Sequence, residues 1–254
     1  MNHVPAAIKT AKARLVVIGN GMAGMRTVEE ILSRNPDKYD ITVFGAEPRV
    51  NYNRIMLSPL LSGEKGFDEI VINTPEWYSE NNIHLYSGDP VVSIDRNRKV
   101  VISKSGTETE YDRLLLATGS DPIIIPVPGH KLNGVVTFRD VDDVDTMLGA
   151  AAKGGPAVVI GGGLLGLEAA VGLQARGMNV TVLHLAGHVM ERQLDPSAGY
   201  LLAQELERRG IKVITAADTG EIVGTENVTG VRLKDGTMIP ADLVVMAVGI
   251  RPNG

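Results

Sequence analysis

Apolar and polar positions along this chain repeat one pattern twice. A short β-branched run at Leu15–Ile18 leads into a glycine-rich turn, after which Met25 and Val28 begin a helical apolar stripe. A second apolar run at Ile41–Phe44 completes a strand–helix–strand unit of the usual size, about 30 residues. The same order of strand, turn, helix and strand returns over residues 157–184. The repeat predicts two related domains.

The rest of the pattern is shorter and more broken. Residues 48–80 mix turns with short helices, and a proline- and glycine-rich loop at Ser120–Gly134 is the best candidate domain boundary. Beyond it we expect a helix at Val141–Ala152, capped by Asp140, and another at Leu201–Arg209. The remaining predicted elements are strands at 83–86, 91–95, 100–103, 213–214, 222–223, 228–233 and 243–248, a hairpin turn at 104–107 and a buried strand at 111–116.

The first glycine turn, GNGMAG, has the residues that a dinucleotide needs. Gly19 allows a tight turn, Gly21 lets the backbone approach a pyrophosphate, and Gly24 lets the helix pack close to the strand. Glu47 follows the second strand, about 20 residues beyond the turn, where a carboxylate binds ribose hydroxyls. The predicted ligand contacts of this turn are Gly19, Gly21, Met22, Ala23 and Gly24, whose amides lie at a helix N-terminus.

The second turn, GGGLLG, repeats this arrangement with one difference. Gly161, Gly163 and Gly166 take the same three roles, and the predicted contacts extend to Leu164, Leu165 and Glu168. His184 stands where an acidic residue would accept a ribose hydroxyl. The sequence leaves open whether His184 binds the cofactor or is a solvated or capping histidine. It also leaves open whether the cofactor is NADH or NADPH.

Two different dinucleotides in one chain indicate an electron relay from a nicotinamide to a second carrier. Flavin suits that role because it accepts a hydride and releases single electrons. The expected cofactors are therefore FAD and NAD(P)H. Hydride transfer needs no acid–base residue, so none is assigned as catalytic.

Composition narrows the remaining function classes. The 254 residues contain no cysteine, so this sequence supplies no thiolate ligands for zinc or iron–sulfur clusters, and its five histidines have no metal-binding spacing. A net charge of −5 without a basic patch argues against nucleic acid as a partner. No apolar run has the length of a membrane span, and no apolar segment follows the basic start as in a secretory signal. We expect a cytoplasmic protein without a resident metal.

Four motifs in order resemble the two-dinucleotide-binding flavoproteins of the glutathione-reductase-like fold. They are GNGMAG with Glu47, the segment YDRLLLATGSDP at residues 111–122, GGGLLGLE, and ADLVVMAVGIRPN at residues 241–253. The resemblance implies an α/β fold with two Rossmann-like domains. It implies a FAD-binding domain at 1–120, a NAD(P)-binding domain at 121–247, and a return to the FAD domain at 248–254. Further implied cofactor contacts are Thr118, Gly119, Gly249 and, after Gly88, Val91.

The subfamily is indicated by the segment NYNRIMLSPLLSGE. Tyr52, Arg54, Leu57 and Ser58 resemble a motif of ferredoxin and rubredoxin reductases, which implies that Arg54 and Ser58 lie on the flavin side. The disulfide reductases of this fold need redox cysteines, which this chain lacks. Together with VMERQLD at Val189–Asp195, the segment is most similar to the FAD/NAD(P)H module of assimilatory nitrite reductase large subunits.

That resemblance implies that electrons pass from NAD(P)H through FAD to a sirohaem/iron–sulfur centre outside this chain. The acceptor would be a downstream domain or a separate electron-acceptor protein; a homodimer is left open. The alternatives are a ferredoxin or rubredoxin reductase, or a dinucleotide-binding fragment without activity. In this fold a second half of the FAD domain follows the NAD(P) domain. We therefore expect the FAD domain to lack its C-terminal half and its FAD affinity to be reduced or lost.

Overall fold

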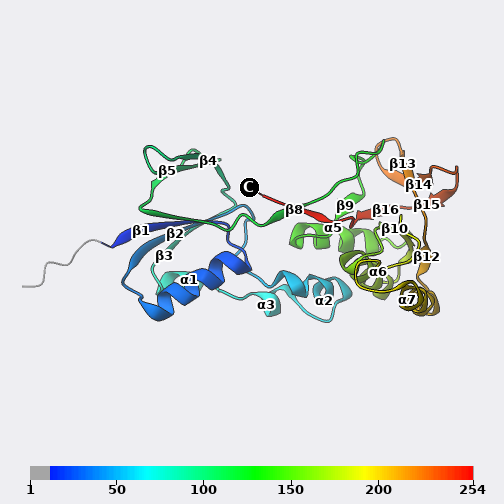
Figure 1. The fold of residues 1–254 in the computed structure, drawn as a ribbon, viewed down its shortest axis with the longest axis horizontal. Helices are drawn as coiled ribbons and strands as arrows, with labels where there is room; N and C mark the ends of the chain where they lie inside the picture. Colours follow the sequence, from blue (N-terminus) through cyan, green and yellow to red (C-terminus); the bar gives the residue numbers. More distant parts are fainter. Residues whose placement is uncertain (1–11, 254) are drawn as a thin grey trace, which may run out of the picture. The chain divides into compact units, whose positions relative to one another are not determined.

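The computed structural model describes residues 12–253, which divide into two compact units. Unit 1 contains residues 12–53 and 71–119, and unit 2 contains residues 54–70 and 120–253. Each unit is an α/β structure built on its own parallel sheet, with the elements labelled in Figure 1. Both predicted strand–helix–strand repeats are present, one in each unit.

Unit 1 is built on a four-stranded parallel sheet in the order β3-β2-β1-β7. Helix α1 (Met22–Arg34) connects the first two strands, as predicted. Strand β1 is buried because it lies between two neighbours, which accounts for its uninterrupted apolar run. The strands of this sheet are β1 (Ala13–Ile18), β2 (Tyr39–Gly45), β3 (Ile83–Ser87) and β7 (Arg113–Leu116).

The prediction of a buried strand at 111–116 is partly wrong. Strand β7 begins at Arg113, and Leu116 at its end is 60% exposed. The reason is that β7 pairs with β1 alone among the described strands and so forms an edge of the sheet. Leu114 and Leu115 are only half-buried. An apolar run does not by itself distinguish a central strand from an edge strand.

Helices cover the sheet of unit 1 through the predicted apolar stripe. Met25 and Val28 of α1 are fully buried in one cluster with Tyr78 of helix α4 (Pro75–Glu80). Helix α4 begins where the Thr74 hydroxyl accepts a hydrogen bond from the amide of Trp77. Tyr78 therefore packs in the core of unit 1.

A second, antiparallel sheet completes unit 1. Its strands β5 and β6 are joined by the predicted hairpin turn, in which Gly106 adopts a φ of +90°. Tyr111 follows this hairpin and is buried with Val101. The strands are β4 (Val91–Asp95), β5 (Val100–Ser103) and β6 (Glu108–Glu110).

Unit 2 is built on a five-stranded parallel sheet in the order β12-β11-β10-β16-β9. It also contains an antiparallel three-stranded sheet, β13-β14-β15, and an antiparallel pair, β8 with β17. The strands are β8 (Ser120–Pro122), β9 (Val135–Thr137), β10 (Pro156–Ile160), β11 (Asn179–Leu183), β12 (Lys212–Ile214), β13 (Thr219–Gly224), β14 (Val228–Leu233), β15 (Met238–Pro240), β16 (Leu243–Met246) and β17 (Ile250–Pro252). The helices are η1 (Arg54–Met56), α2 (Leu57–Ser62), α3 (Phe67–Ile70), α5 (Val141–Ala151), α6 (Leu164–Ala175) and α7 (Pro196–Arg208).

Two boundaries in unit 2 differ from the prediction. Helix α7 begins at Pro196 rather than Leu201, because the Asp195 carboxylate caps it by accepting from the amide of Ala198 at 2.9 Å. The predicted loop at 120–134 begins with strand β8, which pairs with a segment far along the chain. Helix α5 and its cap Asp140 are as predicted.

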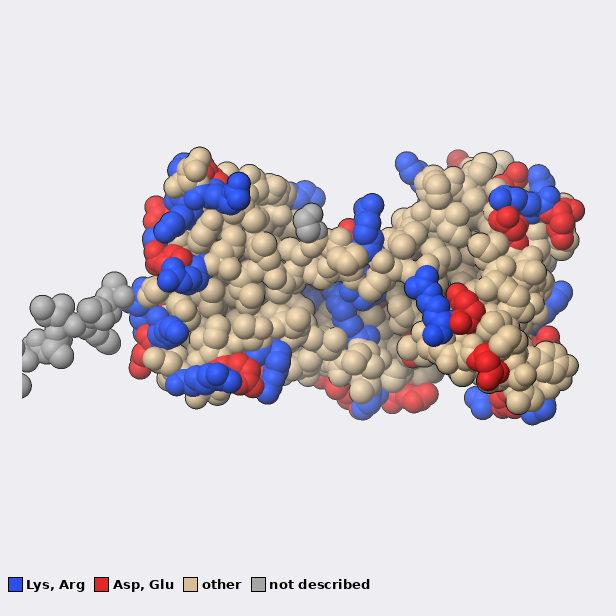
Figure 2. All heavy atoms as spheres, viewed as in Figure 1, with Lys and Arg blue, Asp and Glu red and all other residues tan. Residues whose placement is uncertain are grey.

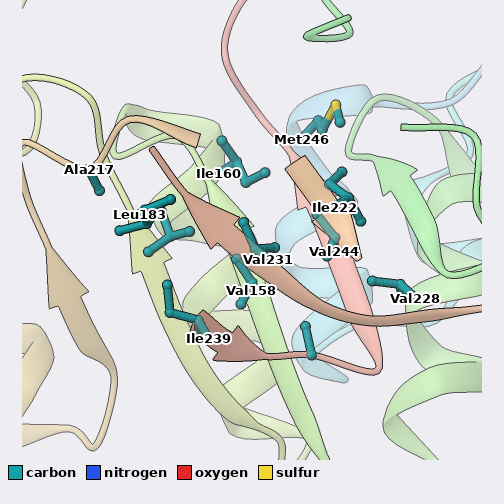
Figure 3. Packing of buried hydrophobic residues seen from close by; sticks show 12 residues of the cluster. Val158, Ile160, Leu183, Ala217, Ile222, Val228, Val231, Ile239, Val244 and Met246 are labelled. Atoms are coloured by element: carbon teal, nitrogen blue, oxygen red, sulfur yellow. The ribbon is translucent and has the colours of Figure 1, made fainter. Parts of the chain in front are cut away.

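The core of unit 2 lies between its two larger sheets (Figure 3). Val158, Leu183 and Val244 come from adjacent strands of the parallel sheet. Val231 and Ile239 come from the antiparallel sheet and pack on the same cluster. The antiparallel sheet therefore covers one face of the parallel sheet with aliphatic side chains.

The segment 54–70 packs in unit 2 through a close contact between α2 and α6. A Cβ on Gly172 of α6 would lie 2.7 Å from the side chain of Leu61, so only glycine allows this approach. The Arg176 guanidinium donates through Nε to the carbonyl of Leu61 at 2.7 Å. These contacts explain why a segment between two unit 1 segments belongs to unit 2.

The exteriors of the units carry mixed charge, and basic and acidic side chains are interspersed on the face in Figure 2. Several of them are paired, among them Arg98 with Glu108 and Arg209 with Glu205. Exposed pairs of this kind contribute about 0–1 kcal/mol each. Within residues 12–253, no helix is long and apolar enough to cross a membrane.

The two faces of α7 offer a matched test of the core of unit 2. Leu206 is 4% exposed and Leu201 is 63% exposed, on the same helix. We expect Leu206→Ala to lower the free energy of unfolding by about 2–5 kcal/mol, because it removes buried methyl groups and leaves a cavity. Leu201→Ala should change it by about 0.5 kcal/mol or less. Urea unfolding followed by circular dichroism measures both; equal losses would contradict the packing described.

Candidate dinucleotide-binding sites

The glycine turn of unit 1 joins β1 to α1, and two backbone segments lie very close together there. Gly19 has a φ of +115°, and a Cβ there would lie 2.1 Å from the carbonyl oxygen of Ala117. A Cβ on Gly24 would lie 2.6 Å from the carbonyl oxygen of Gly19. The amide of Gly19 donates to the carbonyl of Phe44 at 2.8 Å, which ties the turn to the end of β2. Two of the three glycines are therefore required by the fold itself.

Gly21 differs from the other two glycines. It has ordinary extended geometry, caps α1 without a side-chain hydrogen bond, and would place a Cβ in open space. Met22 and Ala23 form the first helical turn after it, where amides point away from the helix. Open space beside amides at a helix N-terminus fits the pyrophosphate of a dinucleotide such as FAD.

Glu47 is oriented by a tyrosine that the sequence did not indicate. The buried Tyr52 hydroxyl donates to Oε2 of Glu47 at 2.6 Å. The carbonyl of Glu47 accepts from the amide of Gly88 at 2.9 Å. The loop that leads into Val91, the first residue of β4, is therefore held against Glu47.

Thr118 and Gly119 lie two and three residues after the end of β7, at the carboxyl edge of the same parallel sheet as the glycine turn. Gly119 has a φ of +70°, and a Cβ there would meet open space. The structure thus places the predicted FAD contacts of unit 1 at one edge of one sheet, the edge where ligands bind in this architecture. Their contact with FAD stays a prediction.

The glycine turn of unit 2 repeats the construction of the first. Gly161 has a φ of +124°, and a Cβ there would lie 2.2 Å from the carbonyl oxygen of Ala247. A Cβ on Gly166 would lie 1.9 Å from the carbonyl oxygen of Gly161. Gly163, like Gly21, caps its helix without a side-chain bond and faces open space. The same fit to a pyrophosphate therefore holds here.

A cleft of about 640 Å³ opens in unit 2 beside this turn. Met246 and Leu183, which end two parallel strands, line it. The acidic and basic side chains along it are Arg139, Glu191, Arg192 and Asp218. The cleft brings together six of the predicted site residues, namely Gly161, Gly163, Leu164, Leu165, His184 and Gly249.

His184 lines this cleft and is buried, with 8% of its surface exposed. The amide of Gly162 donates to its Nδ1 at 3.0 Å, and its Nε2 lies 2.8 Å from Oε2 of Glu191. Because Nδ1 accepts, the hydrogen is assigned to Nε2, which donates to the carboxylate. The alternative of a solvated histidine is wrong; whether His184 contacts a cofactor stays a prediction.

Glu191 was missed as a site residue. It lies in a loop, seven positions beyond His184, and in the sequence only the VMERQLD segment contains it. Burial raises the pKa of its carboxyl, but hydrogen bonds from its own amide and from His184 outweigh this, and the pKa of Glu191 is lowered. The carboxylate is thus charged at neutral pH.

Arg54, Ser58 and Glu168 meet other parts of unit 2. The Ser58 hydroxyl donates to Oε2 of Glu168 at 2.6 Å, which connects α2 to the glycine-turn helix α6. The Arg54 guanidinium donates to the carbonyl of Arg139 at 2.8 Å. Glu168 is not among the residues that line the cleft. The flavin-side roles of Arg54 and Ser58 stay predictions.

Two further histidines bond to backbone carbonyls. His130 contacts the carbonyl of Val127 at 2.8 Å, and His188 contacts that of Leu194 at 3.1 Å. Within residues 12–253, no group of three or more histidine, aspartate or glutamate side chains could hold a metal ion. Both histidines therefore have a structural explanation.

Fold and sites together define an α/β protein with two dinucleotide-binding units, and the comparisons with known proteins agree. Residues 13–254 match the family model of the pyridine nucleotide-disulphide oxidoreductases. The chain belongs to this family. This confirms the predicted fold class and the predicted family resemblance, and membership of this family implies FAD and NAD(P)H as cofactors.

Individual relatives show which members of the family this chain resembles. The chain is 55% identical over 242 residues to the "Nitrite reductase [NAD(P)H]" of Bacillus subtilis, covering 95% of this chain and 30% of that protein. It is 46% identical to the "Assimilatory nitrate reductase electron transfer subunit" of the same organism, covering 95% of this chain and 31% of that protein. The chain thus spans about a third of the length of these relatives.

Solved structures agree with the fold. A ferredoxin reductase for the CYP199A2 system of Rhodopseudomonas palustris superposes with a TM-score of 0.88 at 31% identity. The match covers 95% of this chain and 60% of that structure. None of the comparisons supports a homodimer.

The two kinds of glycine in a turn give a stability test. We expect Gly161→Ala to lower the free energy of unfolding by about 3 kcal/mol or more, because its φ is strained for alanine and its methyl group meets the Ala247 carbonyl. Gly163→Ala should cost about 1 kcal/mol or less, because its geometry is ordinary and its methyl group meets open space. Thermal and urea unfolding measure both, and a large loss in Gly163→Ala would contradict the open space.

Proposed function

We propose that this chain is the electron-input module of a nitrite-reducing enzyme. It would receive hydride from NAD(P)H on FAD and release electrons to a sirohaem/iron–sulfur centre outside this chain. The observation that carries the proposal is the pair of matching turns, each with open space beside an uncapped helix N-terminus. The names of the two Bacillus subtilis relatives support the choice of acceptor.

For FAD we propose a domain at residues 1–120 and the contacts predicted from the sequence. Bound FAD would supply hydride acceptance and single-electron release. The amides of Met22 and Ala23 would bind its pyrophosphate across Gly21, and Glu47, oriented by Tyr52, would accept ribose hydroxyls. The remaining proposed contacts are Gly19, Gly24, Arg54, Ser58, Val91, Thr118 and Gly119, and residues 248–254 are proposed to begin the return to this domain.

For NAD(P)H we propose the cleft of unit 2, within a domain at 121–247. The amides of Leu164 and Leu165 would bind the pyrophosphate across Gly163, and Gly249 would approach the cofactor from the end of the sheet. Glu168, held by Ser58, is proposed as a further contact from α6. These residues would position the nucleotide and exclude water from it, which is the protein's part in a hydride transfer.

The acceptor is proposed to lie in a downstream domain or a separate protein. This sequence has no cysteine, so an iron–sulfur cluster must take its thiolate ligands from elsewhere. We also propose a cytoplasmic location, as expected from the sequence.

A second candidate is a ferredoxin or rubredoxin reductase. The Tyr52, Arg54, Leu57 and Ser58 motif favours it, as does the 31% identity to the Rhodopseudomonas palustris structure. The nitrite reductase assignment is preferred because the identity to that relative is 55%. The two candidates share the cofactors and differ in the acceptor.

A flavin titration tests the proposal. The purified chain is supplied with FAD, its absorbance is recorded, and NADH or NADPH is added without oxygen and then with ferricyanide. We expect flavin bleaching by nicotinamide and catalytic ferricyanide reduction when FAD is supplied in large excess, since we expect its affinity to be weak. A protein that neither binds added FAD nor oxidises either nucleotide would contradict the proposal for this chain.

Two matched glycine variants test which ligand binds at which glycine turn. Gly21→Ala should weaken FAD binding about tenfold or more, because its methyl group displaces a phosphate from charged hydrogen bonds with the helix amides. Gly163→Ala should leave FAD binding intact and weaken nucleotide binding to a similar degree. Equal effects of each variant on both ligands would reject the assignment of one ligand to each turn.

A further inference from the structure

The end of β11 lacks the acidic residue that commonly accepts a ribose hydroxyl, and the structure has a different carboxylate nearby. His184 stands at that position and uses both ring nitrogens, one on the Gly162 amide and one on Glu191. His184 and Glu191 both line the cleft of unit 2, beside the second glycine turn. A carboxylate is therefore present at this edge, supplied from a loop rather than from the strand end.

The hydrogen bonds of His184 determine which of its ring nitrogens carries the hydrogen. Nδ1 of His184 accepts from a backbone amide, so a proton on Nδ1 would break that buried hydrogen bond. The ring is held in the tautomer with its hydrogen on Nε2, which points at Glu191. His184 thereby holds the Glu191 carboxylate at the cleft by a hydrogen bond, and the nearby charge of Arg192 helps to lower the pKa of that carboxyl.

We propose that Glu191, positioned by His184, accepts the hydroxyl groups of the adenosine ribose and makes the cleft select NADH over NADPH. The inference rests on the proposed function, because it takes the cleft to be the nicotinamide nucleotide site. A fixed carboxylate accepts hydrogen bonds from a ribose diol. The same carboxylate repels a 2′-phosphate, so it selects by favouring one ligand and disfavouring the other.

The basic side chains that line the cleft do not form a ready-made binding site for the 2′-phosphate of NADPH, which could otherwise offset the charge of Glu191. Arg139 donates to the carbonyl and the hydroxyl of Ser120. Arg192 is exposed and makes no hydrogen bond or ion pair with the described part of the chain, so binding a phosphate would require it to be ordered. Asp218 adds a second carboxylate and pairs with Lys234 at 2.9 Å. Glu191 is thus the fixed charge beside the position of the ribose.

Calorimetry with two probes that carry no nicotinamide tests the inference independently of flavin chemistry. ADP-ribose has a free 2′-hydroxyl, and 2′-phospho-ADP-ribose has the phosphate of NADPH. We expect the chain to bind ADP-ribose at least about tenfold more tightly, the size of one hydrogen bond to a charged group. Glu191→Gln should bring the ratio of the two affinities close to one. The matched control Glu207→Gln, on α7 outside the cleft, should leave the ratio unchanged.

A double-mutant cycle tests the positioning role of His184. We expect His184→Ala to lower the ADP-ribose preference as Glu191→Gln does, and the double variant to lower it no further, because both act through one carboxylate. If His184 had only a structural role, His184→Ala would weaken the binding of both probes equally and leave the ratio of their affinities at the wild-type value. Circular dichroism on each variant confirms that the fold is retained.

The outcomes separate the inference from the proposed function. Binding of both probes with a ratio that Glu191→Gln does not change would overturn the inference and leave the nucleotide site standing. Tighter binding of 2′-phospho-ADP-ribose, lost in Arg192→Gln, would overturn it in favour of NADPH. Failure of both probes to bind would overturn the inference together with the assignment of the cleft.

Discussion

Each unit depends on one close approach of backbone to backbone. The first glycine of each turn lies against the carbonyl that follows a neighbouring parallel strand, Ala117 for Gly19 and Ala247 for Gly161. Any side chain there would occupy the space of that carbonyl, and the positive φ further disfavours one. The approach fixes where the helix begins relative to the sheet. It therefore fixes where the helix amides lie and where the cleft of unit 2 opens.

The three glycines of a turn have different causes. The first and third are required by packing within the protein, because their missing Cβ atoms make room for backbone. The middle ones, Gly21 and Gly163, have ordinary geometry and face empty space, so nothing in the folded chain requires them. A glycine that the fold does not need, at the N-terminus of a helix with no side-chain cap, points to a ligand.

The two units hold a carboxylate near the end of the second strand by different means. In unit 1 the Tyr52 hydroxyl donates to Glu47, which lies two residues after the end of the strand. In unit 2 the His184 imidazole donates to Glu191, which comes from a loop. Both donors are buried, so each carboxylate is held by a partner that has little freedom. The repeat in the sequence is thus matched by similar chemistry reached through different residues.

The sequence by itself determined the two strand–turn–helix–strand repeats, because glycine spacing and apolar periodicity are local properties of the chain. It also determined most residues that line the second turn, from Gly161 to Leu165. It could not show that β7 is an edge strand, that 54–70 packs on α6, or that Ser58 bonds to Glu168. It likewise could not pair His184 with Glu191. Each of these depends on which distant segments meet, and only the tertiary structure decides that.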